Sequence, residues 1–200
     1  DAARDLLGKE IKCLDKGFVR LVDVMGEDGS IVQAARVSYG KGTKSVSRDR
    51  ELIRYLMRHR HTSPFEMVEF KFHVKLPIFV ARQWIRHRTA NVNEYSGRYS
   101  EMRDEFYLPE TDQIRHQSTM NRQGRSDETL SEQESSDIRN EMDDINSQLY
   151  EKYKSMLDKD LTRELARIEL PLSTYTEWYW KIDLHNLLHF LKLRMDDHAQ

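Results

Sequence analysis

The sequence predicts a single α+β domain in which a mainly antiparallel sheet is flanked by helices. Residues 68–75 alternate apolar and polar side chains with the period of two that is typical of a half-buried strand. Residues 47–59 instead carry apolar side chains at the spacing of a helix. Strand and helix patterns are interspersed without a regular βαβ rhythm, and we find neither an internal repeat nor a linker.

The remaining elements are predicted from the same periodicities and from capping residues. Residues 18–25 and the aromatic segment 175–182 favour strands, and residues 30–37 favour a short helix with Ser30 as its N-cap. Pro77 suits the start of a helix that continues to Arg86. A long helix is predicted by the helical spacing of Ile138, Met142, Ile145, Leu149 and Tyr153. Residues 162–170 predict a helix that Pro171 ends, and Asp183 would cap a last helix that ends near Arg194.

Two polar stretches are predicted to lack regular structure. Residues 87–100 contain Asn, Ser and Gly and favour a loop. Residues 110–136 are rich in Gln, Ser and charged residues, so we expect a mobile insertion there.

Composition excludes several classes of protein. Lys and Arg number 32 and Asp and Glu 34, which gives a net charge of −2 and argues against a protein that coats nucleic acid. The single cysteine, Cys13, permits neither an internal disulfide nor a cysteine-based metal site, and it fits a reducing cytoplasm. We expect a small apolar packing role for it. No apolar run suits a membrane span, and we expect neither membrane nor nucleic-acid partners.

The segment 82–99 carries the clearest chemical signal. It contains four arginines, of which Arg82 and Arg86 would share one helix face and repel each other. A phosphate would offset this repulsion, because guanidinium binds phosphate through two parallel hydrogen bonds. A solvated patch with ion pairs to Glu94 and Glu101, or an RNA-binding surface, remains an alternative reading of the charges alone.

Other motifs point less clearly to a site. His185 and His189 lie four residues apart and could bind a metal, as in a metal-dependent nucleotide hydrolase, but the glutamate of the zinc-protease helix motif is absent and we expect no metal. Four aromatic residues, Tyr175, Trp178, Tyr179 and Trp180, could stack on a ring, although a buried aromatic strand is the simpler interpretation. Neither a glycine-rich dinucleotide fingerprint nor a P-loop is present.

A family resemblance decides among these readings. Arg86-His87-Arg88, followed after seven residues by Ser96, resembles the RHR-x7-S motif of the flavin-dependent thymidylate synthases. Residues 61–66, 79–84, 93–99, 163–167 and 193–200 are similar to further family segments in the same order. The resemblance extends from about residue 14 to the end and is weakest over 110–136. Family members usually continue beyond the position of Gln200 as another helix, which we therefore expect to be missing here.

The resemblance implies an α/β homotetramer with shared active sites. It also implies a reaction in which dUMP, methylenetetrahydrofolate and NADPH yield dTMP, with FAD as the hydride carrier. The other class of thymidylate synthases uses a cysteine nucleophile, whereas a cysteine-free route needs arginines to stabilise charge on the pyrimidine. Ser96 matches the motif's serine, but no general base lies near it in the sequence, so we expect it to bind dUMP rather than attack it.

The resemblance also assigns residues to each ligand. Catalytic roles fall to Arg194, which would favour the N3-deprotonated base, and to Ser96, while Arg98 would hold the phosphate. The residues implied for dUMP are Gln83, Trp84, Ile85, Arg86, Glu94, Tyr95, Ser96, Gly97, Arg98, Arg167 and Arg194. Those implied for FAD are Ser63, Glu66, Arg86, His87, Arg88, Glu94, Asp183, Leu184, His185 and His189.

Overall fold

A five-stranded antiparallel sheet forms the centre of the protein in a computed structural model, which describes residues 2–37, 46–120 and 124–196. The strand order is β1 (Glu10–Cys13), β2 (Gly17–Met25), β3 (Glu69–Pro77), β7 (Tyr175–Asp183) and β4 (Asn91–Glu94). Every neighbouring pair is antiparallel, which confirms the predicted sheet. The strands β1 and β4 were not predicted, and both lie at sheet edges.

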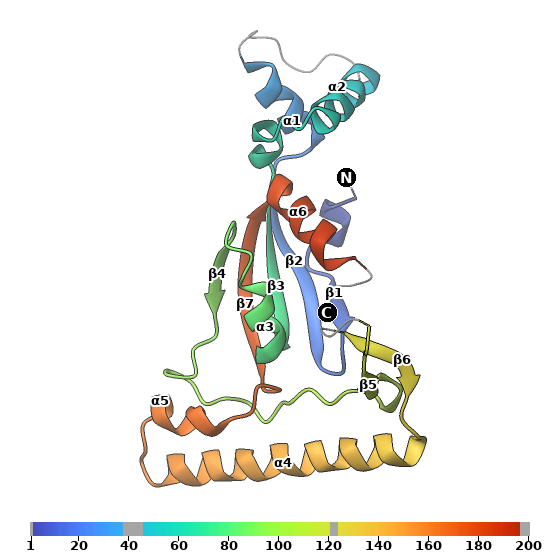
Figure 1. Cartoon of the computed structure of the whole chain (residues 1–200). Coiled ribbons are helices and arrows are strands. Elements are labelled where there is room, and N and C mark those ends of the chain that lie inside the picture. The colour runs from blue at the N-terminus through green and yellow to red at the C-terminus, as the bar shows by residue number, and fades with distance from the viewer. Residues whose placement is uncertain (1, 38–45, 121–123, 197–200) are drawn as a thin grey trace.

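The helices cover one face and both ends of this sheet (Figure 1). Helices α3 (Ile78–Trp84) and α6 (Leu184–Arg194) lie on the face, α1 (Asp28–Ala35) and α2 (Val46–Arg58) extend from one end, and α4 (Glu132–Asp158) runs across the other beside α5 (Arg163–Ala166). Within the described ranges, four 3₁₀ helices connect these elements: η1 (Arg4–Leu6), η3 (Ser63–Met67), η4 (Thr111–Gln113) and η5 (Arg167–Glu169). The predicted α+β architecture is therefore confirmed.

The main core consists of aromatic side chains between the sheet and its two covering helices. Trp178 and Trp180 of β7 are buried, and the ring of Trp84 from α3 meets them edge-on at centroid distances of 5.8 and 5.1 Å. Phe190 of α6 packs on Trp84 and Trp180 at 5.0 Å. Burying one such side chain contributes roughly 1.5–3 kcal/mol. The aromatic segment is thus a strand whose two tryptophans are buried. Their packing against Trp84 and Phe190 fixes the positions of α3 and α6 on the sheet.

The opposite face of the sheet carries the polar residues of β3, as their alternation predicts. His73 and Lys75 are nevertheless mostly buried, because His73 bonds Glu177 at 2.8 Å and Lys75 bonds Glu105 at 2.8 Å. Glu177 also accepts a 2.7 Å hydrogen bond from Arg103. Hydrogen bonds and ion pairs with neighbouring segments therefore satisfy the polar groups of this face.

Smaller cores anchor the two ends of the molecule. Ile31 of α1, Leu56 of α2 and Phe65 of η3 pack together at one end. At the other end Tyr153 of α4 is fully buried with Met102 and Ala166, and its hydroxyl accepts a 2.9 Å hydrogen bond from the Met102 amide. These contacts hold η3 and the segment after β4 in place, and both segments carry predicted site residues.

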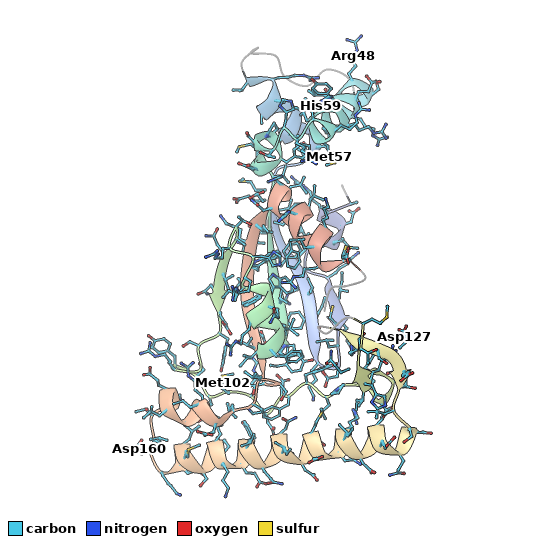
Figure 2. All side chains as sticks on the ribbon, viewed as in Figure 1. Arg48, Met57, His59, Met102, Asp127 and Asp160 are labelled. Carbon is cyan, nitrogen blue, oxygen red and sulfur yellow. The ribbon has the colours of Figure 1, made fainter. Side chains whose placement is uncertain are left out.

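Several local predictions need correction. Glu27 is the N-cap of α1, and Ser30 is its third residue, because the two side chains form a reciprocal capping box. In α2, Met57 is exposed rather than part of the apolar face, and Figure 2 shows it at the α1–α2 end. Helix α3 ends at Trp84, so Arg86 lies beyond it.

The polar stretch 110–136 contains more regular structure than its composition suggests. Its described residues form η4, a two-stranded sheet of β5 (Arg115–Gln117) and β6 (Arg125–Thr129), and the first turn of α4. A capping box between Ser131 and Glu134 begins α4. The mobility of this stretch stays a prediction.

Candidate functional site

Arg194 is held in a fixed position where the ends of α3 and α6 meet. Its Nε donates a 2.9 Å hydrogen bond to Nε2 of His87, and its terminal Nη2 donates one of 3.1 Å to the carbonyl of Gln83. Gln83 lies in the last turn of α3, and carbonyl groups at the C-terminal end of a helix attract cations. The structure therefore brings together three predicted site residues from segments 107 residues apart.

The imidazole of His87 is half-buried between α3 and α6. Its ring meets Phe190 edge-on at 4.9 Å, and its amide donates a 3.0 Å hydrogen bond to the Trp84 carbonyl. Burial, followed by the charges of Arg194 and His189, lowers the pKa of His87 from its ordinary value of 6.5. The neutral ring is the form that accepts from Arg194.

A second group of predicted dUMP residues gathers beside α5 and η5. In the turn after β4, Ser96 Oγ accepts a 3.3 Å hydrogen bond from the Arg98 amide. A methyl group on Gly97 would come within 2.7 Å of the Met102 sulfur and 3.2 Å of Arg167 Cδ, so glycine permits this close approach. The Arg98 side chain lies over Glu164 at 3.6 Å, and both are largely exposed.

The predicted FAD residues surround the other end of β7. Arg88 and Asp183 line a polar cavity of about 250 Å³ together with Asn91 and Lys181. Asp183 caps α6 by accepting a 2.9 Å hydrogen bond from the Asn186 amide, which confirms the predicted cap. The Leu184 amide donates a 2.8 Å bond to the Val68 carbonyl, and this contact places α6 beside η3, which carries Ser63 and Glu66.

Three arginines near this site have no counter-ion. Arg82, Arg86 and Arg88 are exposed and form no ion pair or hydrogen bond through their side chains within the described chain. The expected partners are otherwise engaged, since Glu94 accepts from Thr176 at 2.8 Å and Glu101 pairs with Lys154 at 2.7 Å. The reading of the patch as arginines paired with these two glutamates is therefore wrong, and the uncompensated guanidinium groups favour an anion.

The other predicted residues have mixed environments. The Trp84 indole belongs to the core, Ile85 is exposed, and the Tyr95 hydroxyl donates a 2.7 Å bond to the Glu101 carbonyl. His189 is exposed on α6, and its charge acts on His87. His185, one turn earlier on α6, is half-buried.

The two dUMP groups do not meet within the described chain. We observe no hydrogen bond or ion pair among residues 2–37, 46–120 and 124–196 that links Arg194 to Arg98 or Arg167. Helix α6 begins beside the α1–α2 end, whereas α5 lies beside α4 at the other end (Figure 1).

Sequence reasoning missed several residues that complete these sites. Asn91 and Lys181 line the cavity with Arg88 because β4 pairs with β7 in the register Asn91 to Lys181. Lys181 also pairs with Glu69 at 3.4 Å. No local pattern marks these residues, since only strand pairing brings them together.

Three further findings concern metal binding, Cys13 and membrane spans. In the described ranges, no three or more His, Cys, Asp or Glu side chains are grouped so that they could hold a metal ion. Cys13 is exposed at the end of β1, so the expected packing role is wrong. Of the helices described, none is both long and apolar enough to span a bilayer.

Taken together, the fold and the site define an α+β protein with an arginine-rich candidate anion site beside an antiparallel sheet. Residues 20–200 match the family described as thymidylate synthase complementing protein. The chain is 63% identical over 196 residues to a flavin-dependent thymidylate synthase of Ehrlichia ruminantium strain Gardel, covering 98% of this chain and 66% of that protein. It is 61% identical to a protein of the same name from Treponema denticola, covering 97% and 73%.

This chain therefore belongs to the thymidylate synthase complementing protein family. It spans about two thirds of the length of the Ehrlichia relative. Among solved structures, the UMP/dUMP methylase PolB from Streptomyces cacaoi bound with 5-Br dUMP is 36% identical, with a TM-score of 0.80 over 92% of this chain and 80% of that one.

Proposed function

We propose that this protein is a flavin-dependent thymidylate synthase, which converts dUMP to dTMP with methylenetetrahydrofolate as carbon donor, FAD as hydride carrier and NADPH as reductant. The relatives that bear this name support the assignment. The observation that carries it is the contact between His87, in the family motif, and Arg194, near the other end of the chain. We expect a cytoplasmic enzyme, which suits its single cysteine and small-molecule substrates.

In this proposal the two arginine groups bind opposite ends of the nucleotide. Arg98, with Arg167 beside it, binds the phosphate, because exposed guanidinium groups match its oxygens. Arg194 faces the pyrimidine and stabilises negative charge at N3 and O4, since its orientation is already set by His87 and Gln83. Ser96 shapes the turn that presents Arg98 and contributes to dUMP binding.

The residues predicted for FAD provide groups that suit its charged part. Arg88 projects a free guanidinium at the polar cavity, which matches a pyrophosphate, and Asp183 and Asn91 supply polar groups beside it. The cavity of about 250 Å³ lies below the roughly 300–1,000 Å³ typical of small-molecule sites, so FAD needs further walls. When bound, the flavin would supply the hydride that the carbon unit requires.

A second copy of the chain would supply those walls and complete the dUMP site. Leu165 and Ile168, which flank Arg167, are 51% and 66% exposed, and Met142 and Ile145 of α4 are also exposed. Apolar exposure of this kind is typical of surfaces that another subunit covers. We propose a homotetramer in which Arg194 of one subunit and Arg98 of another contact the same nucleotide.

The alternative functions have less support. A metal-dependent hydrolase would need a ligand cluster, and none is found within the described residues. An RNA-binding module would leave unexplained why Arg194 is half-buried and bonded to the motif histidine.

The proposal is tested with purified protein reconstituted with FAD and separated by gel filtration. Flavin should elute with the folded protein, and tritium should be released from [5-³H]dUMP when methylenetetrahydrofolate and NADPH are supplied. A folded sample that retains no flavin and releases no tritium would show that the proposal is wrong for this chain.

Mixing inactive variants tests the shared site separately. Assayed at limiting dUMP, Arg98→Ala and Arg194→Ala should each be nearly inactive but regain activity when subunits are exchanged, because some hybrid sites then receive only intact residues. An Arg98→Ala/Arg194→Ala double variant mixed with itself is the matched control. Continued inactivity of the hybrids, despite proven exchange, would place both arginines in one subunit's site.

A further inference from the structure

The guanidinium group of Arg194 is fixed at two of its nitrogens before any ligand arrives. Nε donates to the ring of His87, and Nη2 donates to the Gln83 carbonyl. Two hydrogen bonds from different nitrogens define the plane of the group, since guanidinium is rigid and planar. The hydrogens not used in these bonds then remain for a ligand in that same plane.

His87 can act as an anchor because its own position is fixed. Its amide bonds the Trp84 carbonyl, and its ring packs edge-on against Phe190 within the aromatic core. Its Nε2 accepts from Arg194, so the ring proton of the neutral form is on Nδ1. Because the ring packs against Phe190, the lone pair of its Nε2 is directed at Arg194.

We propose that His87 is a positioning residue that orients Arg194 toward the pyrimidine of dUMP. It acts as a neutral hydrogen-bond acceptor, in addition to the flavin contact that the family motif implies. The pyrimidine part of this inference rests on the proposed function, whereas the pairing of His87 with Arg194 does not.

Protonation of His87 would release Arg194. The charges that act on the ring are Arg194 and His189, both from α6, and burial acts in the same direction, so its pKa lies below 6.5. At pH values above this lowered pKa, the ring is neutral and accepts the hydrogen bond from Arg194. As the pH falls through that pKa, the acceptor is lost and two cations face each other.

The contact itself is tested by nitrogen-15 NMR titration of the histidine rings in wild type and Arg194→Gln. Wild-type His87 should be unprotonated at Nε2 at neutral pH, and its pKa should rise toward 6.5 in Arg194→Gln, because a nearby cation and a hydrogen bond to the neutral ring are both removed. Arg82→Gln, which removes an unpaired exposed arginine from α3, should leave it unchanged. An unchanged His87 pKa in Arg194→Gln would overturn the proposal.

The positioning role is tested by ligand affinity in His87→Ala and His87→Gln, compared at equal bound flavin. Glutamine can place its amide oxygen near the position of Nε2, so it should recover most of the affinity that alanine loses. We expect alanine to weaken dUMP and deoxyuridine by a similar factor of about ten or more, because the lost orientation concerns the base. Equal affinity in wild type and His87→Ala would overturn the role.

The two measurements separate this inference from the proposed function. If wild type binds no dUMP but the His87 pKa responds to Arg194→Gln, then the proposed substrate is wrong and the pairing stands. If dUMP binds and His87→Gln is as weak as His87→Ala, the nucleotide assignment stands and the positioning role is wrong.

Discussion

Arg194 and Arg98 are both assigned to the nucleotide, but the protein holds them in different ways. Arg194 is half-buried, and both its ring partner and its carbonyl partner are fixed by the core. The side chain of Arg98 is 55% exposed, and it pairs at 3.6 Å with Glu164, which is 58% exposed. An exposed pair of this kind contributes about 0–1 kcal/mol, so Arg98 can leave it at little cost.

The difference shows where the chain is organised before binding. The side chain of Arg194 loses its conformational entropy during folding, so the group can stabilise developing charge without rearranging. The side chain of Arg98 loses it on binding, when phosphate or a second subunit replaces Glu164. The phosphate end of the proposed site is therefore adaptable, and the pyrimidine end is rigid.

The largest effect that would test this difference is expected from Arg194→Lys. Lysine keeps the charge but cannot donate to His87 and Gln83 in one plane, so we expect dTMP formation to fall by about 10²–10³-fold. Tritium release from [5-³H]dUMP measures it, with Arg82→Lys as the matched control on an exposed, unpaired arginine. Near-normal turnover in Arg194→Lys would show that charge alone suffices at this end.

Arg98→Ala should have the next largest effect, and on binding alone. Loss of charge-assisted bonds should weaken dUMP by about 10–100-fold, while deoxyuridine, which lacks phosphate, should bind equally poorly to both proteins. Isothermal titration of the flavin-loaded protein measures both ligands. Glu164→Gln is the control and should bind dUMP at least as well as wild type. Equal affinity of wild type for dUMP and deoxyuridine would remove the phosphate assignment.

Gly97→Ala tests the packing that supports the adaptable end. A methyl group would lie 2.7 Å from the Met102 sulfur, so Met102 or the turn must move. We expect a loss of stability of about 1–3 kcal/mol in urea unfolding. Ser100→Ala, at an exposed position in the same turn, should unfold like wild type. A fully stable Gly97→Ala would mean that the turn has room that the structure does not show.

The smallest effect is expected from Cys13→Ala. Cys13 is exposed at the end of β1, and none of the site contacts described above involves it. Stability should change by less than about 0.5 kcal/mol, and tritium release should persist. Loss of turnover in a folded Cys13→Ala protein would indicate a cysteine nucleophile and contradict the flavin route.

Local patterns predicted the elements that bury one clear face. The strands around Val74 and Trp178 and the helix capped by Asp183 appeared where their periodicity placed them. The predictions failed where contacts with distant segments determine the local structure. Asn91 has the sequence context of a loop residue, and it lies in a strand only because β4 pairs with β7. Met57 carries an apolar side chain at helical spacing, yet it is 51% exposed.

The sequence by itself determined the family, the sheet and helix types, and the arginines that we propose for the chemistry, because motif order and side-chain periodicity are local properties. Only the tertiary structure decided that Arg194 meets His87 across 107 residues, whereas Arg98 stays at the surface beside Glu164. That difference arises from the aromatic core of Trp84, Trp180 and Phe190, which fixes how α3 and α6 cross. Contacts between distant segments depend on such packing, and a one-dimensional pattern does not contain it.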